Sequence, residues 1–120
     1  MSRGFEDLEI WERAHKPTVY VCRVFIDCRF FALRGRILRT AISVPSKIAE
    51  RAERNFPAEF ARFVGIARGP LGELRSQLMI AWELAVATGA ELETYLRERA
   101  DFSHILYAFT RSLKTPDVLK

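Results

Sequence analysis

The side chains that could bind a metal or act as a reactive thiol are few and widely spaced. The chain has two cysteines, Cys22 and Cys28, and two histidines, His15 and His104. Neither histidine has a cysteine or a carboxylate at a spacing typical of a metal site. The cysteines, six residues apart on one predicted helix, point in different directions and lie too far apart for a disulfide. We therefore predict no metal, no cofactor and two buried, reduced thiols.

Acid–base and nucleophilic arrangements have equally little support. The stretch GPLGEL lacks both the spacing and the lysine of a phosphate-binding loop, and the serines have no histidine in plausible range. Glu50 and Glu53 lie one helical turn apart and could bind a cation or act as acid and base. The alternative interpretation is that the two carboxylates only bond to a neighbouring basic side chain on the helix surface, which would be Arg39, Lys47 or Arg54. The residues therefore predict a protein that is not an enzyme.

The basic residues gather in one segment. The whole chain has a net charge of +4, whereas residues 29–54 carry seven basic and two acidic side chains. Such a stripe favours phosphate or an acidic protein as a partner, although a solvated helix face explains it as well. If nucleic acid binds, RNA or DNA, we expect the phosphate contacts to come from Arg34, Arg36, Lys47, Arg51 and Arg54.

Apolar residues at steps of three and four predict four helices that would position these side chains. Their expected ranges are 7–27, 33–53, 57–88 and 90–114, with the third ending near Thr88 and Gly89, where glycine can adopt the left-handed cap conformation. Pro17 lies inside the first helix and should bend it. The pattern predicts a single domain over residues 1–120, with 115–120 as a frayed tail. The fold class is all-α, an antiparallel up-and-down four-helix bundle.

Pro45 lies inside the predicted second helix, where a proline removes a backbone hydrogen bond and presses on the carbonyl of Ala41. We expect the helix to continue through Pro45 with a bend. The hydroxyl of Ser43 or Ser46 can bond a carbonyl that the proline leaves free. Glu50, one turn further on, could anchor an arginine.

The third predicted helix has more apolar positions than three neighbouring helices can cover. A second apolar set would be exposed in a monomer, and exposed apolar patches commonly mark interfaces. Either these residues pack against the edges of the bundle or they contact another copy of the chain; we favour the second, which predicts a homo-oligomer. The members of this set are Ile66, Met79, Ile80, Trp82 and Val86.

The stretch LRGRILRTAISVPSKIAER, residues 33–51, resembles the four-helix-bundle proteins encoded within intervening sequences of bacterial 23S rRNA genes. The accessory variability protein of diversity-generating retroelements is a relative of that family. FEDLEIWERA and EFARFVGIARGPLGELRSQL resemble its opening and its third helix. Departures from the family pattern occur at Leu38, Thr40, Lys47, Arg51, Phe56 and Pro70. Residues that match the family core around the proline are Ser43, Pro45, Ser46, Ile48, Ala49 and Glu50, which we take to determine the fold rather than to bind a ligand.

The resemblance implies a closed bundle that assembles into a ring-like homopentamer with a non-enzymatic role. For the retroelement relative, nucleic-acid binding through basic surface residues is the usual suggested function. Arg39 matches the family pattern, and we expect it to pair with Glu50 or Glu53 inside the assembly. Two functions therefore stay open: a nucleic-acid-binding accessory protein, and a structural or adaptor homo-oligomer whose basic face meets an acidic protein or only solvent.

The chain lacks the features of a secreted or membrane protein. No apolar run reaches the roughly 18 residues that a membrane span needs. The first residues turn acidic at once and lack an apolar signal core. We expect a cytoplasmic protein with no membrane partner.

Overall fold

The computed structural model describes residues 9–53 and 68–113, without the side chains of 52, 53, 68, 105–107 and 109–113. Within these ranges there are four helices and no strand, which confirms the all-α class. Residues 57–67, where the third predicted helix begins, and the predicted tail, 115–120, lie outside the described part. The helices are α1 (Glu9–Phe25), α2 (Phe31–Glu53), α4 (Arg68–Glu83) and α5 (Gly89–Leu113).

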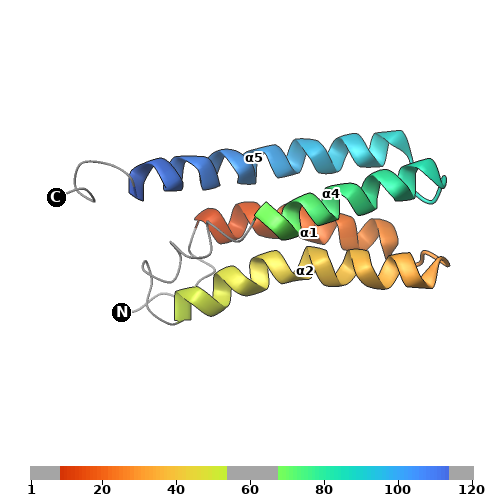
Figure 1. Ribbon diagram of the computed structural model, residues 1–120, viewed down its shortest axis with the longest axis horizontal. Coiled ribbons are helices and arrows are strands. Elements are labelled where there is room, and N and C mark those ends of the chain that lie inside the picture. The colour runs from red at the N-terminus through yellow and green to blue at the C-terminus, as the bar shows by residue number, and fades with distance from the viewer. Residues whose placement is uncertain (1–8, 54–67, 114–120) are drawn as a thin grey trace.

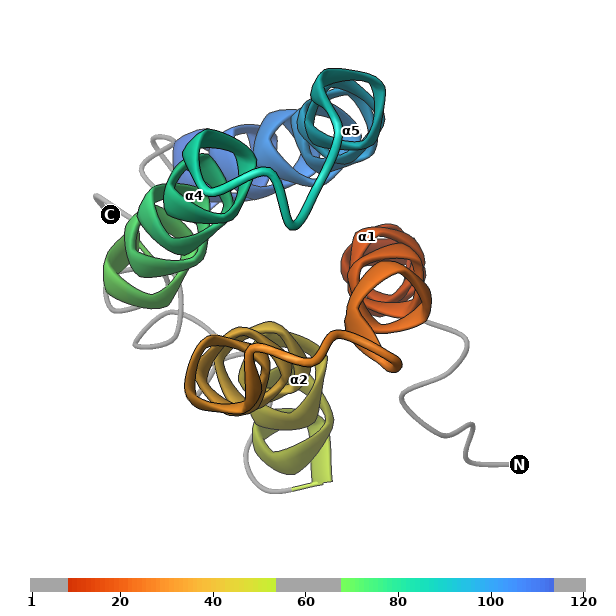
Figure 2. The same ribbon diagram turned by 90° about the vertical axis from the view of Figure 1, so that its right-hand side faces the viewer.

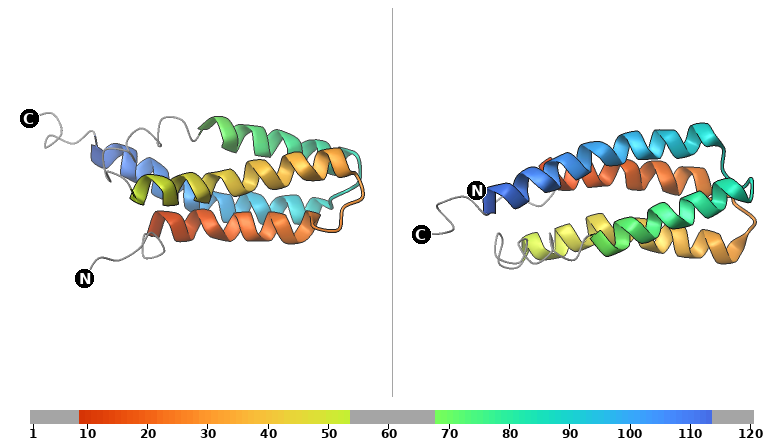
Figure 3. Two further views of the ribbon diagram at one scale, coloured as in Figure 1. Left: turned by 90° about the horizontal axis from the view of Figure 1, so that it is seen from below. Right: turned by 45° about the horizontal axis from the view of Figure 1, so that its top comes forward.

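The four helices lie alongside one another. The chain runs along α1, returns along α2, and later runs along α4 and returns along α5 (Figure 1). The α1–α2 and α4–α5 connections therefore share one end of the molecule, as the two views of Figure 3 also show. Seen end-on in Figure 2, each helix stands beside two others, and the packed pairs are α1 with α2, α2 with α4, α4 with α5, and α5 with α1.

The core forms where the inward faces of the helices meet. On α2 the buried residues recur at steps of three and four, which places them on one face of the helix. Ile37 and Ile48 are completely inaccessible to solvent, and so is Ala41 between them. Phe25 from α1 and Phe102 from α5 are the largest of the fully buried side chains among the described residues. Burial of this one α2 face leaves its opposite face, which carries most of the charge, in solvent.

α2 continues without interruption through Pro45, as predicted, and the proline itself is buried. α1 is likewise continuous through the buried Pro17. A continuous helix through a proline must leave one carbonyl without its usual amide donor, four residues before the ring. For Pro45 that carbonyl belongs to Ala41, in the buried centre of the bundle. The bends at Pro45 and Pro17 stay predictions.

The carbonyl that Pro45 leaves free accepts a hydrogen bond from α1. The Thr18 hydroxyl lies 3.1 Å from the Ala41 oxygen and also 3.1 Å from the Ala14 oxygen of its own helix. Our expectation that Ser43 or Ser46 would serve this carbonyl was wrong. The Ser43 hydroxyl instead donates to the Thr40 oxygen at 2.7 Å, and Ser46 is exposed on the outer surface. The link to Thr18 therefore ties α1 to α2 at the proline.

α4 ends at Glu83, five residues before the predicted end, so that prediction was wrong. The chain leaves the helix through Ala85, whose φ of 62° lies in the left-handed region, whereas no described glycine has a positive φ. The Val86 amide donates to the Ala81 oxygen at 2.9 Å and the Ala85 amide to the Trp82 oxygen at 3.0 Å. This pair of bonds defines a Schellman motif. Ala85 occupies the position that glycine usually takes, at a cost of roughly 1–2 kcal/mol.

α5 begins one residue earlier than predicted because Thr88 caps it. The Glu91 amide donates to the Thr88 hydroxyl at 3.0 Å, and the Thr88 amide donates to the Glu91 carboxylate at 2.9 Å. Two amides that would otherwise lack partners are thus satisfied reciprocally in a capping box. Gly89 is therefore the first residue of α5 and not the left-handed cap of α4.

Candidate nucleic-acid interface

The outward face of α2 presents the basic side chains that could contact phosphate. Arg36 and Arg39 are exposed, and neither forms a hydrogen bond or ion pair with another described residue. Ser43 and Lys47 follow at four-residue steps, so the four side chains share one helix face. At a rise of 1.5 Å per residue, the stretch from Arg36 to Lys47 is about 16 Å long. The face therefore offers three cations in a row.

Arg34 does not belong to this row and instead bonds to the connection between α1 and α2. Its Nη1 donates to two carbonyl oxygens at the end of α1, those of Ile26 at 3.3 Å and Cys28 at 3.4 Å. Its guanidinium also lies over the ring of Phe31, 4.9 Å from the centroid. A cation that bonds carbonyls beyond a helix C-terminus stabilises the helix through its dipole. Sequence reasoning missed this role because it depends on the turn that brings the end of α1 back to α2.

The remaining predicted phosphate contacts have less freedom than Arg36. Lys47 lies 3.8 Å from the Glu50 carboxylate, an exposed pair one turn apart. Such surface pairs contribute about 0–1 kcal/mol, so a phosphate can compete for Lys47. Arg51 is half-buried and already interacts within the chain. Arg54 lies outside the described residues, as does the Glu53 side chain that was a predicted partner of Arg39.

The family residues around Pro45 divide between core and surface. Ile48 is buried and Ala49 half-buried, whereas Glu50 and Ser46 are exposed. Ser43, half-buried, bonds within its own helix. Pro45, Ser46 and Ala49 also line a groove between α1 and α2, so their assignment to the fold rather than to a ligand site stays a prediction.

An apolar surface covers the outer side of α4. Three of the predicted interface side chains are exposed there, and Leu84, which sequence reasoning missed, is exposed beside them. Val86 differs: it is half-buried and packs against the core, because the turn after Glu83 folds it inward. Ile66 lies outside the described residues. The exposed side chains, the α4 surface below, are Met79, Ile80, Trp82 and Leu84.

A groove of about 530 Å³ runs between α1 and α2 on the outside of the proline link. Trp11 stacks on His15 along one wall, with ring centroids 4.6 Å apart. Cys22 and Arg23 from α1, and Ile42 and Pro45 from α2, also line it. Burial raises the pKa of the Cys22 thiol, so this sulfur stays protonated and is a weak nucleophile.

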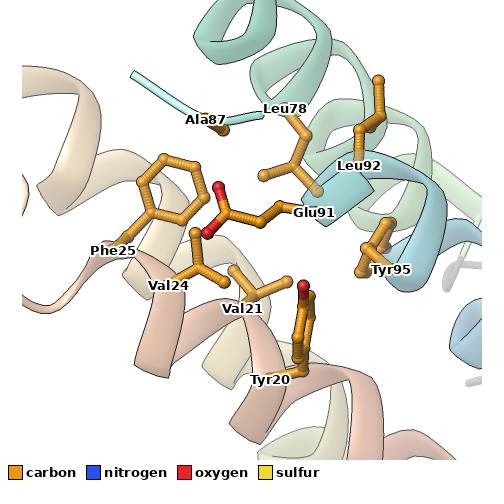
Figure 4. Close-up of a pocket in the computed structure, with 9 residues that line it drawn as sticks. All are labelled: Tyr20, Val21, Val24, Phe25, Leu78, Ala87, Glu91, Leu92 and Tyr95. Atoms are coloured by element: carbon orange, nitrogen blue, oxygen red, sulfur yellow. The ribbon is translucent and has the colours of Figure 1, made fainter. Parts of the chain in front are cut away.

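The other cavity lies inside the bundle near the shared connections. It measures about 10 Å³, no more than the space for one water molecule. Figure 4 shows Tyr20, Phe25 and Leu78 around it, with the Glu91 carboxylate pointing inward. Burial raises the pKa of Tyr95, another lining residue, to about 12 despite the opposing charge of Arg99. This cavity is part of the core packing and is too small for an organic ligand.

The described residues form neither a metal-ligating cluster nor a membrane-spanning helix. No cluster of three or more metal-ligating side chains occurs among them. Within the same ranges, no helix is both long enough and apolar enough to cross a membrane. The basic face of α2 and the α4 surface are therefore the features to be explained.

The sequence model of the family described as 23S rRNA-intervening sequence protein matches residues 6–108. The chain belongs to this family. The match covers most of the chain and includes the α2 region around Pro45, whose residues carry the resemblance. No curated protein matched the chain. The family match includes all of α1, α2 and α4 and most of α5. The charged face of α2 therefore lies within the part of the chain that matches the 23S rRNA-intervening sequence protein family.

The different roles of Arg34 and Arg36 can be distinguished by the effect of each substitution on the free energy of unfolding. We predict that Arg34→Gln lowers the free energy of unfolding by about 0.5–1 kcal/mol, because the α1 carbonyls lose their cationic donor. Arg36→Gln, which removes an exposed side chain without a described partner, should stay within about 0.5 kcal/mol of wild type. Urea unfolding followed by circular dichroism measures both. Equal stability of the two variants would contradict the structural role of Arg34.

Proposed function

We propose that this 23S rRNA-intervening sequence protein is a non-enzymatic, oligomeric accessory protein that binds nucleic acid through phosphate contacts on α2. The observation that carries the proposal is the exposure of Arg36 and Arg39 on one face with Lys47. These residues belong to the segment that holds seven basic and two acidic side chains. Surface arginines without a partner among the described residues are available for phosphate, which they contact without reading base sequence.

Assembly would multiply this charge. The α4 surface supports a homo-oligomer, because four large apolar side chains exposed near one helix end are energetically unfavourable in water. In a pentameric ring, which the family resemblance suggests, the basic face of α2 would recur once per subunit. Phosphate contacts from several subunits would then act together on one polymer, RNA or DNA.

A structural or adaptor role is the second candidate. The observations that favour it are the engagement of Arg34 and Arg51 within the chain and the pairing of Lys47 with Glu50. Because these basic side chains already interact within the chain, fewer of them are available to bind a polyanion. In this reading the α4 surface forms the oligomer and the basic face meets an acidic protein or only solvent.

The assembly is tested by its mass. Light scattering at micromolar concentration should give about five times the subunit mass of 13.8 kDa. Ile80→Glu places a charge in the α4 surface and should shift the mass toward the monomer. Glu93→Lys, on the exposed side of α5, is the control and should leave the mass unchanged. A monomer mass for the wild-type protein would contradict the proposed assembly.

Nucleic-acid binding is tested by its salt dependence. Each phosphate neutralised releases counterions, so affinity should fall steeply between about 50 and 200 mM salt and depend little on base sequence. Arg36→Gln with Arg39→Gln should reduce the slope of log K against log salt by roughly 2 per bound chain, since two phosphate contacts are lost. Fluorescence anisotropy with structured RNA, duplex DNA and single strands measures it.

The matched control for that measurement removes the same number of positive charges from a different part of the surface. Arg75→Gln with Arg97→Gln removes two exposed arginines from α4 and α5. This variant should bind as the wild type does. Equal losses in the two double variants would mean that net charge alone drives binding. No binding by the wild type at low salt would leave the adaptor reading.

A further inference from the structure

Two aromatic side chains are exposed where α1 turns into α2. Phe31 is 65% exposed and Phe30 47%, at the end of the bundle that carries both connections. Ile26, at 61%, lies beside them in sequence. A large apolar ring in water costs free energy unless a partner covers it, so exposed aromatics of this kind call for an explanation.

Arg34 holds the Phe31 ring in place. Its Nη1 is tied to the carbonyl oxygens of Ile26 and Cys28, and its guanidinium lies over the ring at 4.9 Å from the centroid. Guanidinium and aromatic planes attract each other through the ring's quadrupole. One face of Phe31 is therefore covered by a fixed cation, and the exposed remainder of the ring is available to a second planar group.

The electrostatics at this end of the bundle favour an anion. Arg29 and Arg36 are exposed on either side of the aromatic pair in sequence, and Asp27 is the acidic residue within the connection. α2 has no acidic residue in its first turn. The positive end of its dipole is therefore not compensated by a carboxylate of its own first turn. An arriving phosphate would relieve this accumulation of positive charge.

We propose that the α1–α2 end of the bundle is a stacking site for unpaired nucleobases, with the Phe31 ring as the platform, Phe30 next to it in sequence, and Arg29 and Arg36 as phosphate contacts. This inference rests on the proposed nucleic-acid function and names its ligand class, single-stranded RNA or DNA. Within a duplex both faces of each internal base are already stacked, so along such a helix a surface ring finds no open base face, whereas unpaired bases offer one. Arg36 joins this site to the basic face of α2, because it belongs to both.

The test compares oligonucleotides of equal length that differ in their bases. The probes are a single-stranded oligo(U), an abasic strand with the same number of phosphates, and a duplex. Wild-type protein should bind oligo(U) about tenfold more tightly than the abasic strand, the gain expected for stacking on one ring. Phe31→Leu should abolish this preference while leaving the affinity for the abasic strand and the duplex unchanged. Phe31→Tyr, which keeps an aromatic plane, should retain it.

Ile26→Ala is the matched control, since it removes an equally exposed apolar side chain that is not aromatic. It should keep the preference for oligo(U). The stacking site would be overturned if Ile26→Ala lost the preference for oligo(U) as Phe31→Leu does. It would also be overturned if Phe31→Leu had a lower light-scattering mass than the wild type. Either result would identify a general apolar contact. Salt-dependent binding with no difference between oligo(U) and the abasic strand would overturn the stacking site alone. Absence of binding to all three probes would overturn the nucleic-acid function with it.

Discussion

The arrangement of this bundle depends on one buried carbonyl. Pro45 cannot donate a hydrogen bond to the Ala41 oxygen, and Ala41 is completely inaccessible to solvent. A buried carbonyl without a donor costs roughly 1–3 kcal/mol. The Thr18 hydroxyl of α1 meets this need at 3.1 Å. Because hydrogen bonds tolerate little change in distance, α1 and α2 must remain in one register at this point.

A second link between the same helices lies at the α1–α2 connection. Arg34 of α2 bonds the carbonyls of Ile26 and Cys28 at the end of α1. The two links act at different heights of the helix pair, one at the proline and one at the turn. Together they orient α2 about its axis, so that Ile37 and Ile48 point into the core and Arg36 and Arg39 point into solvent. The candidate phosphate contacts and the stacking site are therefore both positioned by the α1–α2 pair.

The sequence predicts the parts of this structure that local periodicity determines. The three- and four-residue steps on α2 identify its buried face and its continuity through Pro45, because one apolar face is a property of a single helix. The partner of the Ala41 oxygen was not predictable in the same way. Thr18 lies 23 residues away, and its hydroxyl reaches the carbonyl only after two helices pack. Arg34 was likewise assigned to phosphate because its charge is visible in the sequence and its contacts are not.

The end of α4 illustrates a limit of a different kind. Gly89 is the residue type expected at a left-handed cap, and Ala85 is not. Because the Thr88–Glu91 capping box makes Gly89 the first residue of α5, however, Gly89 does not cap α4. The chain leaves α4 earlier, through Ala85. This competition between two local signals moved Val86 inward and left Leu84 exposed on the α4 surface. Three side chains of the α4 surface, Met79, Ile80 and Trp82, were thus predicted from the sequence, and Leu84 was not.

The measurement that tests the central link most directly is a double-mutant cycle between Thr18→Val and Pro45→Ala. In the wild-type background, Thr18→Val should lower the free energy of unfolding by about 1–2 kcal/mol, since the Ala41 oxygen loses its donor. In Pro45→Ala the restored amide of residue 45 serves that oxygen, so the same change should cost about 1 kcal/mol less. Thr94→Val, whose hydroxyl bonds the Ala90 oxygen within α5, should be additive with Pro45→Ala. Equal costs of Thr18→Val in both backgrounds would contradict the account.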